Sequence, residues 1–203
     1  TIQVSAPDLL ASHDHGVSDS DDITNEDSPD LAVSCDVGDT ISLRHGLHAE
    51  SLYLSATCYA PTTTLKITLN ADTPVVAVAT DAAGNSVTSE PLMLWIDTTP
   101  PEPLANLTFL DASTTPSMDI EQCEPGTNLL VAFVIADVPL YEHITPCPQE
   151  GPDQGPEESE PIDWALDEAL VAGQLYDVVA WVVDIAGNAS TAYTTSFQPA
   201  PPE

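Results

Sequence analysis

Hydrophobic residues in this chain occur in short runs, and in many runs apolar and polar side chains alternate. β-Branched residues are frequent in the runs, and Gly, Pro, Asn and Asp separate them, as is typical of β-strands joined by turns. In the first half this pattern predicts strands at residues 31–35, 40–44, 52–58, 64–69, 75–80 and 92–96.

The second half shows the same pattern. It predicts strands at residues 104–110, 128–136, 175–183 and 191–197. Residues 163–170 fit either one helical turn or a strand followed by a turn. About seven short strands per roughly 100 residues are typical of an antiparallel Ig-like sandwich. We therefore predict an all-β protein made of two tandem antiparallel Ig-like β-sandwiches of about seven strands each.

The two halves resemble each other in sequence as well as in pattern. "CDVGDT" from Cys35 matches "CEPGTN" from Cys123, and "VAVATDAAGN" matches "VAWVVDIAGN". This duplication predicts one sandwich over residues 1–98 and a second over residues 99–203. The second half is longer because of an acidic segment at 148–161, which lacks aliphatic and aromatic residues. We interpret that segment as a loop insertion.

Four cysteines recur at nearly the same spacing in the two halves. The spacing predicts one disulfide per half, Cys35 with Cys58 and Cys123 with Cys147, and the alternative is four free buried thiols. Each bridge would close a loop worth about 3 kcal/mol in the chain-entropy model. Disulfides of this kind indicate an oxidising, extracellular compartment.

The charge of the chain is strongly negative. It carries 33 Asp and Glu residues but only Arg44 and Lys66 against them, a formal net charge of −31. Such a balance excludes nucleic acid and anionic membranes as partners. No stretch is long and apolar enough for membrane insertion. The sequence also lacks the nucleophile-elbow, zinc-protease and phosphate-loop motifs, so we do not expect an enzyme.

Two segments resemble a known family. "APDLLASHDHGVSDSDDITNEDSP" and "ATDAAGNSVTSEPLMLWIDTTPP" are similar to the opening and closing parts of the bacterial Ig-like repeats of large surface adhesins, including RTX-type biofilm adhesins. The resemblance covers the first half and, more weakly, residues 164–195. It implies an extracellular, cell-surface location, rod-like strings of repeats whose partners are neighbouring repeats of the same chain, and bound Ca²⁺.

Aspartates are the candidate calcium ligands, because Ca²⁺ takes six to eight oxygen ligands. By resemblance, Asp81 and Asp184 are the positions matched to the family, and the segment around Asp14 meets Asp81 at one pole of the first sandwich. A solvated acidic loop that needs no ion is the alternative. The full set of predicted ligands is Asp14, Asp19, Asp21, Asp22, Asp81, Asp97, Asp111 and Asp184.

Asp97 lies in the predicted linker, where it could share an ion with the second copy through Asp111. Gln3 and Gln198 stand at the equivalent places and cannot supply a charge. His13 and His15 are two residues apart and could bind Zn²⁺ with a third ligand. The oxygen-rich surroundings favour a hard cation instead, so we expect these to be exposed loop histidines.

These features predict a calcium-stiffened spacer of a bacterial surface adhesin that projects a distant binding domain. One alternative is an Ig-like module that itself binds a protein or glycan ligand through the 148–161 segment. Another is an accessory module of a secreted enzyme. Adaptation to a saline environment would explain the acidity without calcium.

Overall fold

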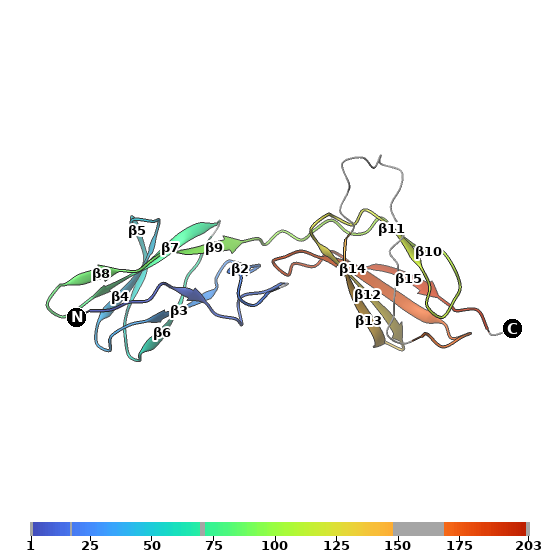
Figure 1. The fold of residues 1–203 in the computed structure, drawn as a ribbon, viewed down its shortest axis with the longest axis horizontal. Helices are drawn as coiled ribbons and strands as arrows, with labels where there is room; N and C mark the ends of the chain where they lie inside the picture. The colour runs from blue at the N-terminus through green and yellow to red at the C-terminus, as the bar shows by residue number, and fades with distance from the viewer. Residues whose placement is uncertain (1, 17, 70–71, 148–168, 202–203) are drawn as a thin grey trace. The chain divides into compact units, whose positions relative to one another are not determined.

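The computed structural model describes residues 2–16, 18–69, 72–147 and 169–201. These residues form strands, turns and loops, and none of them is helical. The all-β prediction is therefore confirmed. The chain divides into two compact units, with the boundary in the sequence between Thr99 and Pro100. Figure 1 shows the strands of each unit. The predicted insertion at 148–161 and most of the ambiguous segment 163–170 lie outside the described residues.

Unit 1 is built from two sheets. A three-stranded sheet has the order β1-β3-β6, and a six-stranded sheet has the order β2-β9-β7-β4-β5 with β8 paired to β7. The strands are β1 Asp8–Leu9, β2 Ile23–Thr24, β3 Asp30–Ser34, β4 Thr40–His45, β5 Ser51–Thr57, β6 Thr62–Lys66, β7 Thr73–Thr80, β8 Ser86–Thr88 and β9 Leu92–Ile96.

Alternation along the strands of unit 1 places one face of each sheet in a shared core. Leu31 and Val33 of β3 are fully buried, as are Ile41 and Leu43 of β4, whereas the residues between them are not. The buried residues of both sheets form one hydrophobic cluster. The sandwich follows from the period-2 pattern of the sequence.

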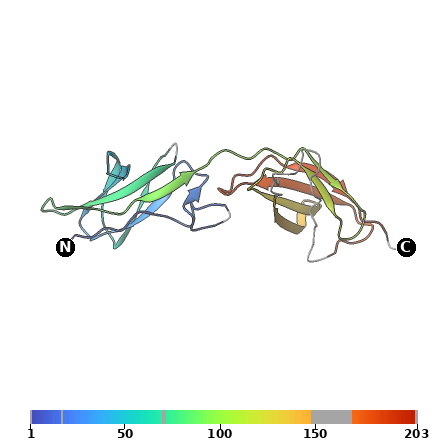
Figure 2. The same cartoon turned by 45° about the horizontal axis from the view of Figure 1, so that its top comes forward.

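Strand register defines two poles in unit 1. At the N-terminal pole Val4 bridges to Cys35, and Thr40 lies opposite both Thr57 and Thr80. At the C-terminal pole β2 pairs with the end of β9, and the start of β7 pairs with Leu94. Both views show β8 at one end of unit 1 and the loop before β2 at the other (Figures 1 and 2).

The described part of unit 2 also has two sheets, with fewer strands. A two-stranded sheet pairs β10 with β11, and a four-stranded sheet has the order β13-β12-β14-β15. Its core contains Phe133 stacked edge-on against Tyr176 and Phe197. The strands are β10 Asn106–Phe109, β11 Met118–Glu121, β12 Asn128–Ile135, β13 Val138–Pro146, β14 Tyr176–Val183 and β15 Tyr193–Phe197.

Four of the strands missing from the sequence prediction share a cause, and β13 has another. β1, β2, β8 and β11 are two to four residues long, too short for a hydrophobic period to show. β13 contains Pro139 and Pro146, which argue against a central strand; it is an edge strand, where proline is tolerated. Among the described residues no helix is long and apolar enough to span a membrane.

Candidate functional site

The acidic loop of unit 1 lies at its C-terminal pole. β1 pairs with β3, and the Leu10 amide donates to the Asp30 carbonyl at 3.2 Å. A turn follows, in which the amides of His13 and Asp14 both donate to the Leu10 carbonyl. The loop then returns to the fold as β2, which pairs in parallel with β9. The chain leaves unit 1 directly after β9, so this loop sits where the linker begins.

Asp14 is the central side chain of this loop. Its residue is only 4% exposed, although the loop around it lies at the surface. The Asp22 amide donates to Asp14 Oδ2 at 3.2 Å. Asp14 Oδ1 has no hydrogen-bond partner and is fully buried. A buried carboxylate oxygen without a partner is costly, and a bound cation would remove that cost.

The charges around Asp14 are of the same sign. Burial raises its pKa; the Asp22 amide opposes this, and the neighbouring Asp21 carboxylate raises the pKa further. Burial also raises the pKa of Asp22, and the charges of Asp14, Asp8 and Asp21 add to that shift. These four aspartates form what we call the acidic pocket. Their like charges repel one another, and this repulsion adds to the rise in the pKa of Asp14 and Asp22.

Asp8 is a member of the pocket that the sequence prediction missed. It is the first residue of β1, and its charge raises the pKa of Asp22. Only the pairing of β1 with β3 brings it there, and no local sequence signal marks it. Asp22 itself has a φ of 61°, a left-handed conformation that aspartate tolerates better than most residues.

His13 and His15 contact one carboxylate beside the pocket. His13 Nδ1 lies 2.7 Å from Glu26 Oε2, and His15 Nε2 lies 2.9 Å from Glu26 Oε1. His13 Nε2 also lies 3.3 Å from Asp30 Oδ2. The hydrogen bonds from His15 and then His13 hold the pKa of Glu26 below its usual range. The expectation of exposed loop histidines is corrected: His13 is only 19% exposed, because the turn after β1 directs it onto Glu26 and Asp30.

The remaining predicted ligands of the loop are more exposed than Asp14. Asp19 and Asp21 are exposed, and Asp21 Oδ1 accepts a hydrogen bond from the Ile23 amide. Among the described residues, no group of three or more His, Cys, Asp or Glu side chains stands in an arrangement ready to hold a metal ion. The acidic pocket would therefore have to close further around an ion.

Asp81 and Asp184 occupy identical turns in the two units. Asp81 Oδ1 accepts hydrogen bonds from the amides of Ala83 and Asn85, and Oδ2 accepts one from the Asn85 side chain. These bonds, that of the Asn85 side chain first, hold the pKa of Asp81 below its usual range. Asp184 makes the same set with Ala186 and Asn188.

The glycines of these turns, Gly84 and Gly187, have φ of 86° and 88°, a conformation that glycine adopts without strain. Each "D-x-A-G-N" loop is thus a turn that its own aspartate holds together, and the carboxylate needs no cation to satisfy it.

The expectation that Asp81 meets the acidic loop at one pole is wrong. Thr80 pairs with Thr40 near the disulfide, whereas Thr73, at the other end of the same strand, pairs with Leu94. β7 is eight residues long, which separates its ends by roughly 25 Å. Asp81, which follows β7, therefore lies at the N-terminal pole, and the acidic pocket, which precedes β2, lies at the C-terminal pole. Figure 1 shows β8 and β2 at opposite ends of unit 1.

Asp97 and Asp111 also stabilise local turns. Asp97 Oδ1 accepts a hydrogen bond from the Thr99 amide at 2.9 Å. Asp111 accepts from the amides of Ser113 and Ser117. Hydrogen bonds from the Ser113 side chain first, and then from the Ser117 and Ser113 amides, lower the pKa of Asp111 to about 2.

The position of Asp111 in unit 2 differs from the prediction. The Ala200 amide donates to the Ala112 carbonyl at 2.7 Å, so the Asp111 loop lies at the pole where unit 2 ends. The linker enters at the opposite pole, where the Ala105 amide donates to the Glu121 carbonyl. The assumption that Asp111 lies at the linker end of unit 2 is therefore wrong.

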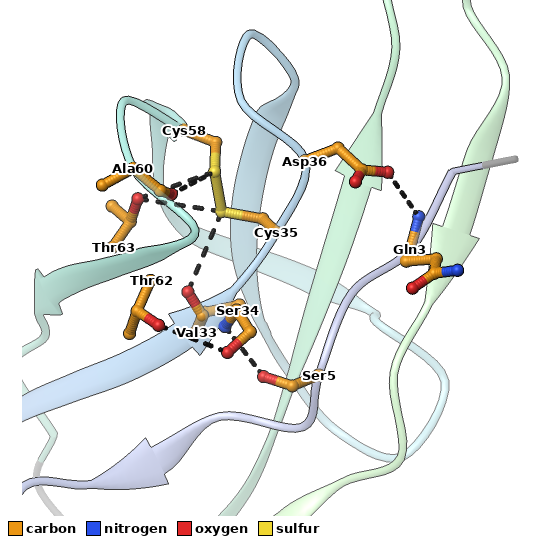
Figure 3. Close-up of a disulfide and its surroundings, with 10 residues drawn as sticks. All are labelled: Gln3, Ser5, Val33, Ser34, Cys35, Asp36, Cys58, Ala60, Thr62 and Thr63. Carbon is orange, nitrogen blue, oxygen red and sulfur yellow. Dashed lines mark hydrogen bonds between the residues drawn. A yellow bond between two sulfur atoms is a disulfide. The ribbon is translucent and has the colours of Figure 1, made fainter.

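Both predicted disulfides are present. Cys35 is joined to Cys58 and Cys123 to Cys147, and no free cysteine remains. Both bridges lie at the N-terminal poles of their units: the first joins the β3–β4 connection to the β5–β6 connection, and the second joins the β11–β12 connection to the end of β13. The Thr63 hydroxyl lies 3.7 Å from both sulfurs of the first bridge, and Figure 3 shows these residues together. Nearby, the Gln3 amide donates to Asp36 Oδ2.

A comparison with protein families identifies the first unit. Residues 1–98 match the model of the bacterial Ig-like domain. Unit 1 is a bacterial Ig-like domain. No curated protein is similar enough to match the chain.

The chain that contains this bacterial Ig-like domain is also similar to solved structures. The fibronectin(III)-like modules of CbhA from Clostridium thermocellum match at a TM-score of 0.50 and 15% identity, over 85% of this chain and 86% of theirs. The BSP domain of a biofilm-associated protein matches at 0.30 and 14%, over 98% of this chain and 30% of its own. A structure from a 1.5-MDa bacterial ice-binding adhesin matches at 0.40 and 16%, over 98% and 63%.

Proposed function

We propose that the chain is a spacer segment of a bacterial cell-surface adhesin, and that Ca²⁺ bound in the acidic pocket stiffens the C-terminal pole of unit 1. Membership of unit 1 in the bacterial Ig-like family supports the adhesin role. The two disulfides support an extracellular, oxidising location. The role is structural rather than catalytic, and its partners are neighbouring Ig-like repeats.

Burial of Asp14 is the observation that carries the calcium proposal. Its Oδ1 is enclosed without a hydrogen-bond donor, and the carboxylates of Asp8, Asp21 and Asp22 raise the local negative charge. Asp14, Asp21 and Asp22 would hold the ion, with Asp8 close by. Ca²⁺ supplies charge neutralisation and ties these oxygens to one centre.

An ion in the acidic pocket would lie close to the strand that leads into the linker. Asp22 immediately precedes β2, and β2 pairs with β9, whose end leads into the linker. An ion that fixes Asp14 to Asp22 would therefore fix the loop beside the last strand of the domain. If this loop has less conformational freedom, the end of β9 and the start of the linker become more rigid.

Isothermal titration calorimetry of the full chain with CaCl₂ tests the proposal. We expect at least one binding event in the wild type, and its loss or a large weakening in Asp14→Asn. Asp177→Asn is the matched control, because it removes one charge from an exposed position on β14 of unit 2. Equal affinity in the wild type and Asp14→Asn would refute the assignment of the site.

The stiffening is tested separately by small-angle X-ray scattering of the full chain in CaCl₂ and in EDTA at equal ionic strength. We expect calcium to narrow the distribution of intramolecular distances in the wild type and not in Asp14→Asn. Identical distributions in both buffers, with calcium bound, would show that the ion does not stiffen the chain.

A further inference from the structure

Two histidine rings converge on one carboxylate beside the acidic pocket. His13 Nδ1 lies 2.7 Å from Glu26 Oε2, and His15 Nε2 lies 2.9 Å from Glu26 Oε1. Asp14, which stands between the two histidines in the sequence, instead accepts a hydrogen bond from the Asp22 amide. Neighbouring side chains of this segment therefore belong to two different clusters. We call His13, His15 and Glu26 the histidine cluster.

Backbone structure on both sides holds the histidine cluster in place. The His13 amide donates to the Leu10 carbonyl at 2.7 Å, in the turn that follows β1. The Glu26 amide donates to Oγ1 of Thr24 at 3.1 Å, and Thr24 is a fully buried residue of β2. The side chains thus start from anchored positions, which lowers the entropic cost of gathering them around an ion.

His13 faces a second carboxylate with its other ring nitrogen. Its Nε2 lies 3.3 Å from Asp30 Oδ2. A neutral imidazole carries one hydrogen, so it can donate to only one of the two carboxylates. A metal ion on Nδ1 together with a hydrogen on Nε2 would satisfy both sides of the ring. In such carboxylate–histidine–metal arrangements the outer carboxylate fixes the tautomer and the orientation of the ligand.

The donor atoms of the histidine cluster select a class of metal. Two imidazole nitrogens and a carboxylate suit Zn²⁺, whereas Ca²⁺ takes oxygen ligands. Zinc binds nitrogen and oxygen at about 2.0–2.2 Å, so neighbouring ligand atoms of its tetrahedron lie roughly 3.3 Å apart.

The histidine cluster is close to this spacing but has not reached it. Its N···O distances of 2.7 and 2.9 Å are those of hydrogen bonds, in keeping with the lack of ready metal geometry among the described residues. The donor atoms would have to separate by roughly half an ångström to admit the ion. The sequence showed the two histidines without a third ligand, and the fold supplies Glu26 from the segment after β2.

We propose that His13, His15 and Glu26 form a zinc site separate from the acidic pocket, with Asp30 as the positioning residue of His13. Water completes the tetrahedron, because the side chains of His15 and Glu26 are each more than a third exposed. The ion ties the turn after β1 to the segment after β2. This site goes beyond the spacer role and does not depend on calcium, so the two metal sites can succeed or fail separately.

Isothermal titration calorimetry of the full chain with ZnCl₂ tests the site, in a buffer that already contains excess CaCl₂. Calcium competes for oxygen ligands, so the remaining binding reports nitrogen ligands. We expect one zinc ion per chain in the wild type, and loss of that event in His13→Gln and in His15→Gln. His48→Gln is the matched control, because His48 is an exposed histidine between β4 and β5.

Three outcomes of this titration would overturn the assignment. The first is equal zinc affinity in the wild type and in both cluster variants. The second is loss of zinc binding in His48→Gln. The third is zinc binding that excess CaCl₂ abolishes, since the ion would then sit among carboxylates alone.

Long-range ¹H–¹⁵N NMR of the imidazole rings identifies the ligand atoms in the wild-type chain, so it does not depend on the folding of any variant. We expect zinc to shift Nδ1 of His13 and Nε2 of His15 to values typical of coordinated nitrogen, and to leave a hydrogen on Nε2 of His13. The rings of His45 and His48 should not change. Unchanged His13 and His15 rings, or coordination through Nε2 of His13, would overturn the proposed geometry.

Two variants at Asp30 test its positioning role. Asp30→Ala removes the acceptor that faces Nε2 of His13, whereas Asp30→Asn keeps an oxygen there. We expect the zinc affinity to fall roughly 10- to 100-fold in Asp30→Ala, and to recover in part in Asp30→Asn. Equal zinc affinity in the wild type and Asp30→Ala would overturn the role of Asp30.

Discussion

The two C-terminal poles occupy equivalent places in a duplicated fold, and their carboxylates behave in opposite ways. In unit 1 Asp14 is buried, one of its oxygens lacks a partner, and burial together with the Asp21 charge raises its pKa. In unit 2 Asp111 is exposed, accepts hydrogen bonds from Ser113 and Ser117, and has a pKa lowered to about 2.

This difference shows that acidity alone does not make a cation site. A carboxylate that backbone amides already satisfy gains little from an ion, whereas a buried carboxylate that faces other carboxylates gains much. Chain length is the structural cause. In unit 1 residues 18–22 fold back on Asp14, where the Asp22 amide donates to its carboxylate, but in unit 2 residues 111–116 make only a tight turn.

Removal of a disulfide is the change with the largest expected effect, and it should affect the two units alike. The bridges close loops of 23 and 24 positions, so each is worth about 3 kcal/mol of unfolding free energy. Scanning calorimetry of Cys35→Ser/Cys58→Ser and of Cys123→Ser/Cys147→Ser should each show one lowered transition. The two pairs thereby assign the transitions to the units. A pair that moves both transitions would show that the units do not unfold independently.

Calcium should change the thermal stability of unit 1 but not that of unit 2. At a hundredfold excess over its dissociation constant, an ion that binds only the folded state adds about 2.7 kcal/mol, which corresponds to a rise of roughly 10–20 °C for a domain of this size. We expect this rise in the unit 1 transition and no change in that of unit 2, compared with EDTA at the same ionic strength. Coincident unit 1 midpoints would favour salt adaptation as the cause of the acidity.

The effect of Asp14→Asn on the stability of unit 1 should have opposite signs in EDTA and in CaCl₂. In EDTA it relieves repulsion in the acidic pocket and raises the stability of unit 1 by on the order of 1 kcal/mol. In CaCl₂ it removes a ligand and lowers that stability. Asp177→Asn, the exposed control in unit 2, should leave the unit 1 transition unchanged in both buffers. Stabilisation by Asp14→Asn in both buffers would show that the pocket is only a repulsive cluster.

Much of the fold could be predicted from the sequence, because long alternating strands such as β4 and β7 show their period directly. The repeated cysteine spacing also gave the correct disulfides. The parallel β2–β9 pair could not be predicted, since β2 is two residues long and its partner is about 70 residues away.

The acidic site could be predicted only in part. The run that contains Asp14, Asp21 and Asp22 stands out by its charge, but which member is buried depends on the turn after Leu10. The family-matched Asp81 was placed at the wrong pole, because resemblance gave its role without the direction of β7. Asp8 carries no local signal, and tertiary pairing alone brings its charge near Asp22.

The pH dependence of two matched variants gives the smallest effect and tests the electrostatic contrast directly. The pKa of Asp14 is raised in the folded state, so its contribution to stability is present below pH 3.8 and is lost as the pH rises through the folded value. In EDTA, the gain from Asp14→Asn should therefore be absent below pH 3.8 and grow above it. The pKa of Asp111 falls from 3.8 to about 2, so the loss caused by Asp111→Asn should be full at neutral pH and shrink as the pH falls toward 2. Urea unfolding of both variants between pH 2 and 7 measures how the change in unfolding free energy varies with pH. If this change varied with pH in the same direction for both variants, the electrostatic distinction between the two poles would be lost.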